Sequence, residues 1–181
     1  MYYERAVNST MLAALGYISV QQAAPIEATI TKFKQLLDYA TTHPDAIVTY
    51  TASDMVLAGH SDASYISETN ARSRAGGHFF MSADSPNPPN NGTVLTISQI
   101  IKGVMSSAAE AKLGDLFINC REAISARLAL EEMGHKQPPT PIQTDNTTAL
   151  GVVQNNLATK RLKLIDMKFH WLRCRAAQRQ L

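Results

Sequence analysis

The sequence is poor in cysteine and has no long apolar segment. Its two cysteines, Cys120 and Cys174, are too few and too isolated for a disulfide framework and make no metal-type spacing. No stretch approaches the roughly 18 continuous apolar residues of a membrane helix, and the N-terminus MYYERAVNST lacks the apolar region of a signal peptide. These absences argue against a disulfide-stapled secreted domain and against a membrane partner. We therefore expect a soluble protein of a reducing compartment.

The length and composition are those of a small globular protein. The chain has 181 residues, of which 45% are hydrophobic. This length corresponds to one domain, or to one domain with an appendage. A folded chain of this size hides roughly two-thirds of its unfolded surface, so a sizeable core is expected.

Positive charge is concentrated at the C-terminus. The segment from Lys160 to Leu181 holds seven Lys or Arg residues and one acid, Asp166, for a charge of +6. The net charge of the chain is +2, so the other residues sum to −4. This asymmetry is typical of a basic helix that meets a polyanion. For a charge run alone, a solvated helix face is the simpler interpretation.

Apolar periodicity and turn residues predict an α+β fold, with helices packed on a mixed β-sheet. Ser107 is the expected N-cap of the long helix and Gly134 its C-terminal stop, while Asn91-Gly92 ends the loop of an antiparallel hairpin. One apolar stripe is expected along the long helix, formed by Ala109, Leu113, Leu116, Phe117, Cys120, Ile124 and Leu128. The expected elements are helices over 8–24 and 26–42, strands over 55–64 (or 47–52), 73–82 and 93–101, the long helix over 106–134, a short strand over 141–145, a helix over 146–156 and a basic helix from Lys160.

Three carboxylates stand out by position. Asp62 lies in the first core strand, Glu110 one turn into the long helix, and Asp145 at the end of the short strand, each among small residues. Small neighbours allow a bulky ligand to approach, and clustered acids repel one another unless cations bind between them. Hard divalent ions such as Mg²⁺ prefer oxygen ligands, and two of them about 4 Å apart can hold the attacking and leaving oxygens of a phosphodiester.

Each carboxylate also has a structural interpretation. Glu110 fits a capping box with Ser107, Asp145 can cap the next helix, and Asp62 can end its strand at a turn. Taken singly, these interpretations are favoured over a metal site. Taken together they are weaker, because one architecture explains all three acids. Spacing alone leaves the choice open.

A family resemblance adds to this pattern. The motifs HSDASY, RSRAGGHFF, ISQIIKGVMSSAAEAKLGDL, PTPIQTDNTTAL and KRLKLIDMKFHWLR, over about residues 55–175, resemble the ribonuclease H domain of copia-type LTR retrotransposon Pol polyproteins. The upstream part, with FKQLLDYA as a loose match, resembles the segment that joins the reverse transcriptase to that domain. The resemblance implies a helical connection segment over 1–50 and a ribonuclease H-like domain over 51–181.

The resemblance also implies a chemistry. Asp62, Glu110 and Asp145 would be catalytic residues that bind two Mg²⁺ ions, with Mn²⁺ as a substitute, for hydrolysis of the RNA strand of an RNA–DNA hybrid. The implied partners are the hybrid and the reverse transcriptase portion of the same polyprotein, in the cytoplasm within a virus-like particle, or in the nucleus. The residues expected to contact nucleic acid are Ser61, Ser64, Ser107, Asn146, Lys160, Arg161 and Lys163.

One departure from the family puts activity in doubt. Ribonuclease H sites usually have a fourth carboxylate near the start of a final helix, which follows a fifth strand. We expect this strand and this helix to be missing, because the sequence reaches Leu181 before any such motif. Asp166 is a weaker candidate ligand, since it lies within the basic helix and an intrahelical partner suits it better. The alternative function is therefore an inactive, truncated retroelement fragment that keeps the fold as a nucleic-acid-binding module.

Overall fold

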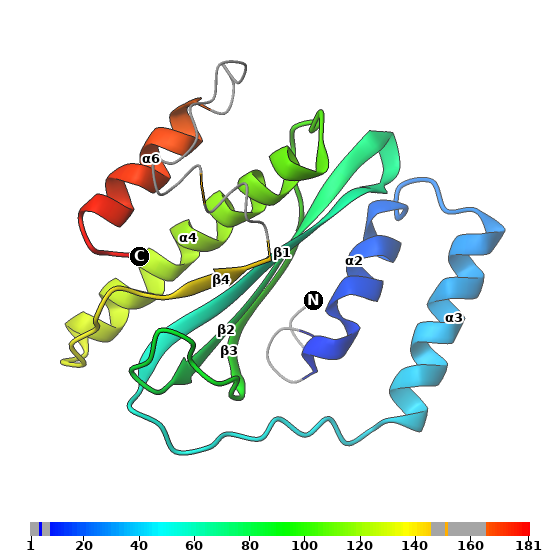
Figure 1. Ribbon diagram of the computed structural model, residues 1–181. Helices are drawn as coiled ribbons and strands as arrows, with labels where there is room; N and C mark the ends of the chain where they lie inside the picture. Colours follow the sequence, from blue (N-terminus) through cyan, green and yellow to red (C-terminus); the bar gives the residue numbers. More distant parts are fainter. Residues whose placement is uncertain (1–3, 5–7, 146–150, 152–165) are drawn as a thin grey trace. The chain divides into compact units, whose positions relative to one another are not determined.

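The computed structural model describes residue 4, residues 8–145, residue 151 and residues 166–181. The chain forms two compact units, Met1–Thr49 and Tyr50–Leu181 (Figure 1). Within the described residues, no helix has both the length and the apolar character needed to cross a membrane.

The first unit consists of short helices. A 3-10 turn, η1 (Ser9–Met11), leads into α2 (Leu12–Val20), and α3 (Glu27–Thr42) follows. The side chain of Asn8 caps η1 by accepting a hydrogen bond from the backbone N–H of Thr10 at 3.2 Å. Both expected helices are therefore present, the first over a shorter range. The buried apolar side chains of this unit are Met11, Leu12 and Leu36.

The second unit is built on a four-stranded sheet. Its strands are β1 (Val56–Glu68), β2 (Arg72–Ser82), β3 (Thr93–Ile100) and β4 (Ile142–Thr144). They lie in the order β3-β2-β1-β4, with β1–β2 and β2–β3 antiparallel and β1–β4 parallel (Figure 1). This confirms the predicted α+β class with a mixed sheet and an antiparallel hairpin.

Residues 47–52 form no strand, so the first strand is the later of the two candidates. Here the chain is held by side-chain contacts instead. Asn91 accepts a hydrogen bond from the Thr51 backbone N–H at 2.8 Å and donates one to the Thr51 carbonyl at 2.9 Å. Tyr50 donates to the carbonyl of Thr93 at 2.9 Å.

The long helix α4 (Ala108–Glu132) packs along β1 and β2. The Ser107 hydroxyl accepts from the Glu110 N–H at 3.2 Å, as predicted for an N-cap. At the other end, Gly134 has φ +91°, its N–H donates to Glu131, and the next N–H donates to Leu130 at 2.9 Å. These bonds make a Schellman motif, which stops the helix at the predicted glycine.

The buried face of α4 differs from the expected stripe at both ends. Ala109 is exposed and Leu128 is 49% exposed, whereas Asp115 and Asn119 are fully buried. Asp115 and Asn119 leave the helix on the side opposite to the stripe, where the small residues of β1 and β2 leave room for polar side chains between helix and sheet. The apolar middle of the stripe does lie in the core.

The C-terminal helix α6 (Asp166–Ala177) covers α4. Phe169 and Leu172 are buried against α4, and Trp171 meets the edge of Phe117 with 5.2 Å between ring centroids. The buried side chains of this cluster are Leu113, Leu116, Cys120, Phe169 and Leu172. The helix expected over 146–156 lies outside the described residues, apart from residue 151.

Candidate active site

Two of the three predicted carboxylates lie side by side. Asp62 is at the middle of β1, and Asp145 comes directly after β4. The parallel register pairs Ser61 with Thr144, so the next step along both strands brings Asp62 beside Asp145. Both carboxylates are exposed, with 74% and 66% of their side-chain surface open. They line a depression of 360 Å³ formed by His60, Ser61, Asp62, Gln143, Thr144 and Asp145.

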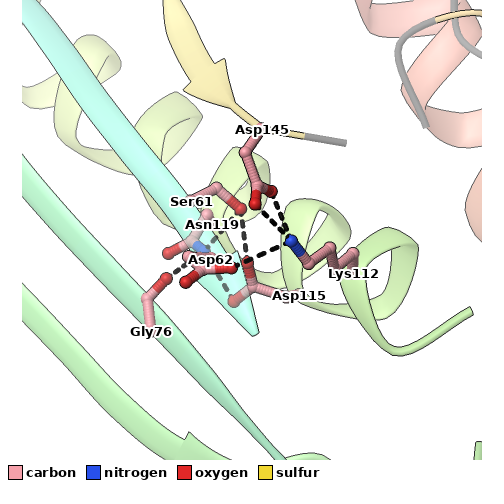
Figure 2. Close-up of polar contacts among 7 residues, drawn as sticks. All are labelled: Ser61, Asp62, Gly76, Lys112, Asp115, Asn119 and Asp145. Carbon is pink, nitrogen blue, oxygen red and sulfur yellow. Dashed lines mark hydrogen bonds and ion pairs between the residues drawn. The ribbon is translucent and has the colours of Figure 1, made fainter. Parts of the chain in front are cut away.

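A lysine from α4 lies between these carboxylates (Figure 2). Lys112 Nζ is 2.5 Å from Asp145 Oδ1 and 3.4 Å from Asp62 Oδ1. The hydrogen bond to Asp145 raises the pKa of Lys112; burial opposes the rise, and the charge of Asp62 adds to it. The ammonium therefore remains charged at neutral pH and neutralises part of the charge of the acid pair.

The third predicted carboxylate is engaged elsewhere. Glu110 Oε2 accepts hydrogen bonds from the Ser106 N–H, at 2.6 Å, and from the Ser106 hydroxyl. Glu110 precedes Lys112 by two positions, which is about 200° around the helix. The two side chains consequently leave α4 on opposite sides. The capping box expected between Glu110 and Ser107 is thus shifted, since Glu110 contacts Ser106 rather than the Ser107 N–H.

A buried polar network lies directly behind the acid pair (Figure 2). Ser61 donates its hydroxyl hydrogen to Asp115, and the amide of Asn119 donates to Asp115 at 2.9 Å, to Ser61 at 3.0 Å and to the Gly76 carbonyl at 3.0 Å. Burial raises the pKa of Asp115 to about 7, although hydrogen bonds from Ser61, the Gly76 backbone and Asn119 oppose the rise. The network ties the centre of β1 and β2 to α4.

The strand glycines make this network possible. A Cβ built on Gly77 would lie 1.9 Å from Asn119 Oδ1, and one on Gly76 would lie 2.9 Å from the Asp62 carbonyl oxygen. Both distances are shorter than an ordinary Cβ contact, so a larger residue at either position would force the neighbouring atoms to move. A close approach of this kind is typical of glycines inside a strand.

Of the residues expected to contact nucleic acid, the structure describes Ser61, Ser64 and Ser107. Ser61 is 3% exposed and bonded to Asp115, so its burial corrects the expectation that it lies on a contact surface. Ser64 is exposed with its hydroxyl 2.6 Å from that of Ser67, and Ser107 is exposed as the N-cap of α4. Asn146, Lys160, Arg161, Lys163 and the side chain of Asp166 lie outside the part of the chain that the structure describes.

Sequence reasoning missed Lys112, Asp115 and Asn119. Asp115 and Asn119 lie about 200° and 240° around the helix from Leu113, opposite the expected apolar stripe, so their four-residue spacing on one helix face is the signal that could have paired them. A lysine on a helix has no comparable signal. Its pairing with Asp145 depends on where β4 lies against α4, which spacing does not give.

Fold and site together define an α+β domain with two carboxylates on parallel neighbouring strands and a lysine between them. No family model matches the chain. The chain is 25% identical to the Retrovirus-related Pol polyprotein from transposon TNT 1-94 of Nicotiana tabacum, over 94% of its own length. It spans 13% of that relative. The expected resemblance to a retrotransposon Pol polyprotein is thereby confirmed.

Among solved structures, the chain is similar to RNase H1 from the halophilic archaeon Halobacterium salinarum NRC-1. The identity is 14% and the TM-score 0.37, with 71% of this chain and 77% of the other covered. Similarity at this level carries no argument about the activity of the chain.

Proposed function

We propose that residues 51–181 are the ribonuclease H-type domain of a retroelement Pol polyprotein and act on RNA–DNA hybrids. One observation carries the proposal. In a chain that matches a Pol polyprotein over 94% of its length, Asp62 and Asp145 lie side by side on parallel strands. Residues 1–50 would be the segment that connects this domain to the reverse transcriptase portion, which would be its covalent partner in the cytoplasm or nucleus.

The chemistry of such a domain is hydrolysis of the RNA strand, for which two Mg²⁺ ions would supply charge stabilisation at the attacking and leaving oxygens. The residues present do not fit that ion pair. Lys112 Nζ lies between Asp62 and Asp145, and Glu110 is bonded to Ser106. Within the described residues, no three His, Cys, Asp or Glu side chains form a group that could hold a metal ion.

This disagreement favours a second candidate function, a domain that binds RNA–DNA hybrids and does not cleave them. Recognition of a hybrid depends on shape, phosphates and 2′-hydroxyl groups rather than on metal ions. The depression beside Asp62 and Asp145 is open and lined by the polar side chains of His60, Gln143 and Thr144. Such groups can meet a sugar-phosphate backbone without a catalytic ion.

One experiment separates the candidates. The whole chain is titrated into a labelled RNA–DNA hybrid and, in parallel, into RNA and DNA duplexes of the same sequence, and binding is followed by fluorescence anisotropy. The same samples are then incubated with Mg²⁺ and resolved on a denaturing gel. Preferential hybrid binding supports the ribonuclease H-type assignment. Cleavage of the RNA strand identifies the hydrolase, binding without cleavage the second candidate, and equal affinity for all three duplexes contradicts both.

A further inference from the structure

We infer that Lys112 is a built-in counter-ion that keeps divalent cations out of the Asp62–Asp145 pair, and that an acidic residue at position 112 would convert the pair into a divalent cation site. This inference rests on the proposed function only for its biological setting. Its physical content, which is the affinity of the chain for a metal ion, can be measured without any nucleic acid.

The ammonium of Lys112 occupies the position that a shared metal ion would need. Lys112 Nζ lies 2.5 Å from Asp145 Oδ1 and 3.4 Å from Asp62 Oδ1, so the ammonium takes the space between the two carboxylates (Figure 2). A Mg²⁺ ion binds carboxylate oxygens at about 2.0–2.1 Å. An ion shared by Asp62 and Asp145 would therefore have to lie where the ammonium lies.

The charge of Lys112 also weakens the attraction of the acid pair for a divalent ion. Two carboxylates and one ammonium sum to −1, whereas the acid pair alone would be −2. A divalent ion brought to the pair would gain less attraction and would also meet the ammonium at close range, where like charges repel strongly. Only 24% of the Lys112 side chain is exposed, so the lysine is held against the protein and is not a freely swinging surface chain.

The neighbouring acids Glu110 and Asp115 cannot supply the metal ligands that Lys112 displaces. Glu110 leaves α4 on the side opposite to Lys112 and is bonded to Ser106. Asp115 is fully buried, with its oxygens taken by Ser61 and Asn119. Neither carboxylate can add a ligand while these bonds persist. Lys112, by contrast, reaches both Asp62 and Asp145 from α4.

The test measures Mn²⁺ binding to the whole chain by electron paramagnetic resonance of the free ion, supported by calorimetry. Four proteins are compared: the parent chain, Lys112→Glu, Lys112→Gln and Lys136→Glu. The Gln variant removes the ammonium without adding a carboxylate. The Lys136→Glu variant makes the same charge change at an exposed residue beyond the far end of α4, about 30 Å along the helix from position 112.

The expected order of Mn²⁺ affinity is Lys112→Glu, then Lys112→Gln, then the parent chain and Lys136→Glu, which should be equal. We expect Lys112→Glu to bind at least tenfold more tightly than the parent, and the gain to disappear when Asp62→Asn is added. Circular dichroism checks that each protein is folded. If Lys112→Glu does not fold, a gain in Lys112→Gln over the parent supports the inference and no gain overturns it.

Two other results would overturn the inference. One is saturable Mn²⁺ binding by the parent chain that is lost in Asp145→Asn, because the pair would then accept a metal beside Lys112. The other is a folded Lys112→Glu protein with the parent's affinity. Hybrid anisotropy on the same proteins tests the proposed function separately, since hybrid binding can fail while the Mn²⁺ titration still decides the role of Lys112.

Discussion

At the scale of single residues, two charged groups from the same helix have opposite relations to the solvent. Lys112 is held in an ion pair at the surface, whereas Asp115, three positions later, is fully buried. An exposed ion pair contributes little to stability, typically below about 1 kcal/mol. A buried carboxyl group with a raised pKa makes stability depend on pH, so Asp115 offers the sharper stability measurement.

We predict that Asp115 lowers the free energy of unfolding as pH rises. Its pKa is about 7 in the folded protein and 3.8 in an ordinary environment, so between these values the folded state keeps a proton that the unfolded state has released. Stability therefore falls from pH 3.8 to 7 and stays lower above pH 7. The shift sets an upper limit of about 4 kcal/mol. Urea unfolding from pH 4 to 8 should show a shallower fall for Asp115→Asn than for the parent.

The matched control for this prediction is Asp84→Asn, which removes an exposed carboxylate in the same unit. It should follow the pH profile of the parent. Parallel profiles for the parent and Asp115→Asn would mean that Asp115 is ionised in the folded protein without cost. The network with Ser61 and Asn119 would then be a satisfied buried anion rather than a proton-holding group.

At the scale of elements, α4 is ended by backbone conformation rather than by side-chain packing. Gly134 has φ +91°, and an added Cβ would meet no atom within 4 Å. Gly134→Ala should therefore lower the free energy of unfolding by about 1 kcal/mol, through left-handed backbone strain alone. Thermal unfolding with Gly103→Ala as the control tests this, because a Cβ there makes an ordinary contact of 3.5 Å without positive φ. Equal losses in the two variants would contradict it.

The elements were largely predictable from local sequence, and their contacts were not. The strand β2, the helix α4 and the glycine that ends it follow from residue alternation and turn chemistry, which act over a few positions. The pairing of Lys112 with Asp145 joins residues 33 positions apart. The place of Asn119 beside Asp115 depends on Gly77 in another element, where a Cβ would lie 1.9 Å from Asn119 Oδ1. Such contacts follow from packing between elements, which periodicity does not encode.

At the scale of the whole molecule, basic side chains of the C-terminal helix take part in packing. In α6, the guanidinium of Arg173 lies 4.6 Å from the centre of the Phe169 ring, and that of Arg175 lies 5.2 Å from the centre of the Trp171 ring. Both contacts lie within α6, whereas Lys168 Nζ, 5.7 Å from the centre of the Phe117 ring, makes a cation–π contact with α4. Part of the positive charge of α6 therefore belongs to the packing of the domain.

The segment between α3 and β1 should be the first site of proteolysis. Residues 43–55 between α3 and β1 form no regular secondary structure, and Ile47 is 84% exposed. Thermolysin, which cleaves before large apolar residues, should first cut before Ile47, because Tyr50 and Thr51 are tied to Thr93 and Asn91. Mass spectrometry should show products 1–46 and 47–181, with the larger persisting since its sheet and helices lie wholly beyond the cut.

Ile30, 51% exposed within α3, is the internal control. Equally early cleavage there would mean that α3 opens as readily as the connecting segment, and that the first unit is not an independently stable element of the chain.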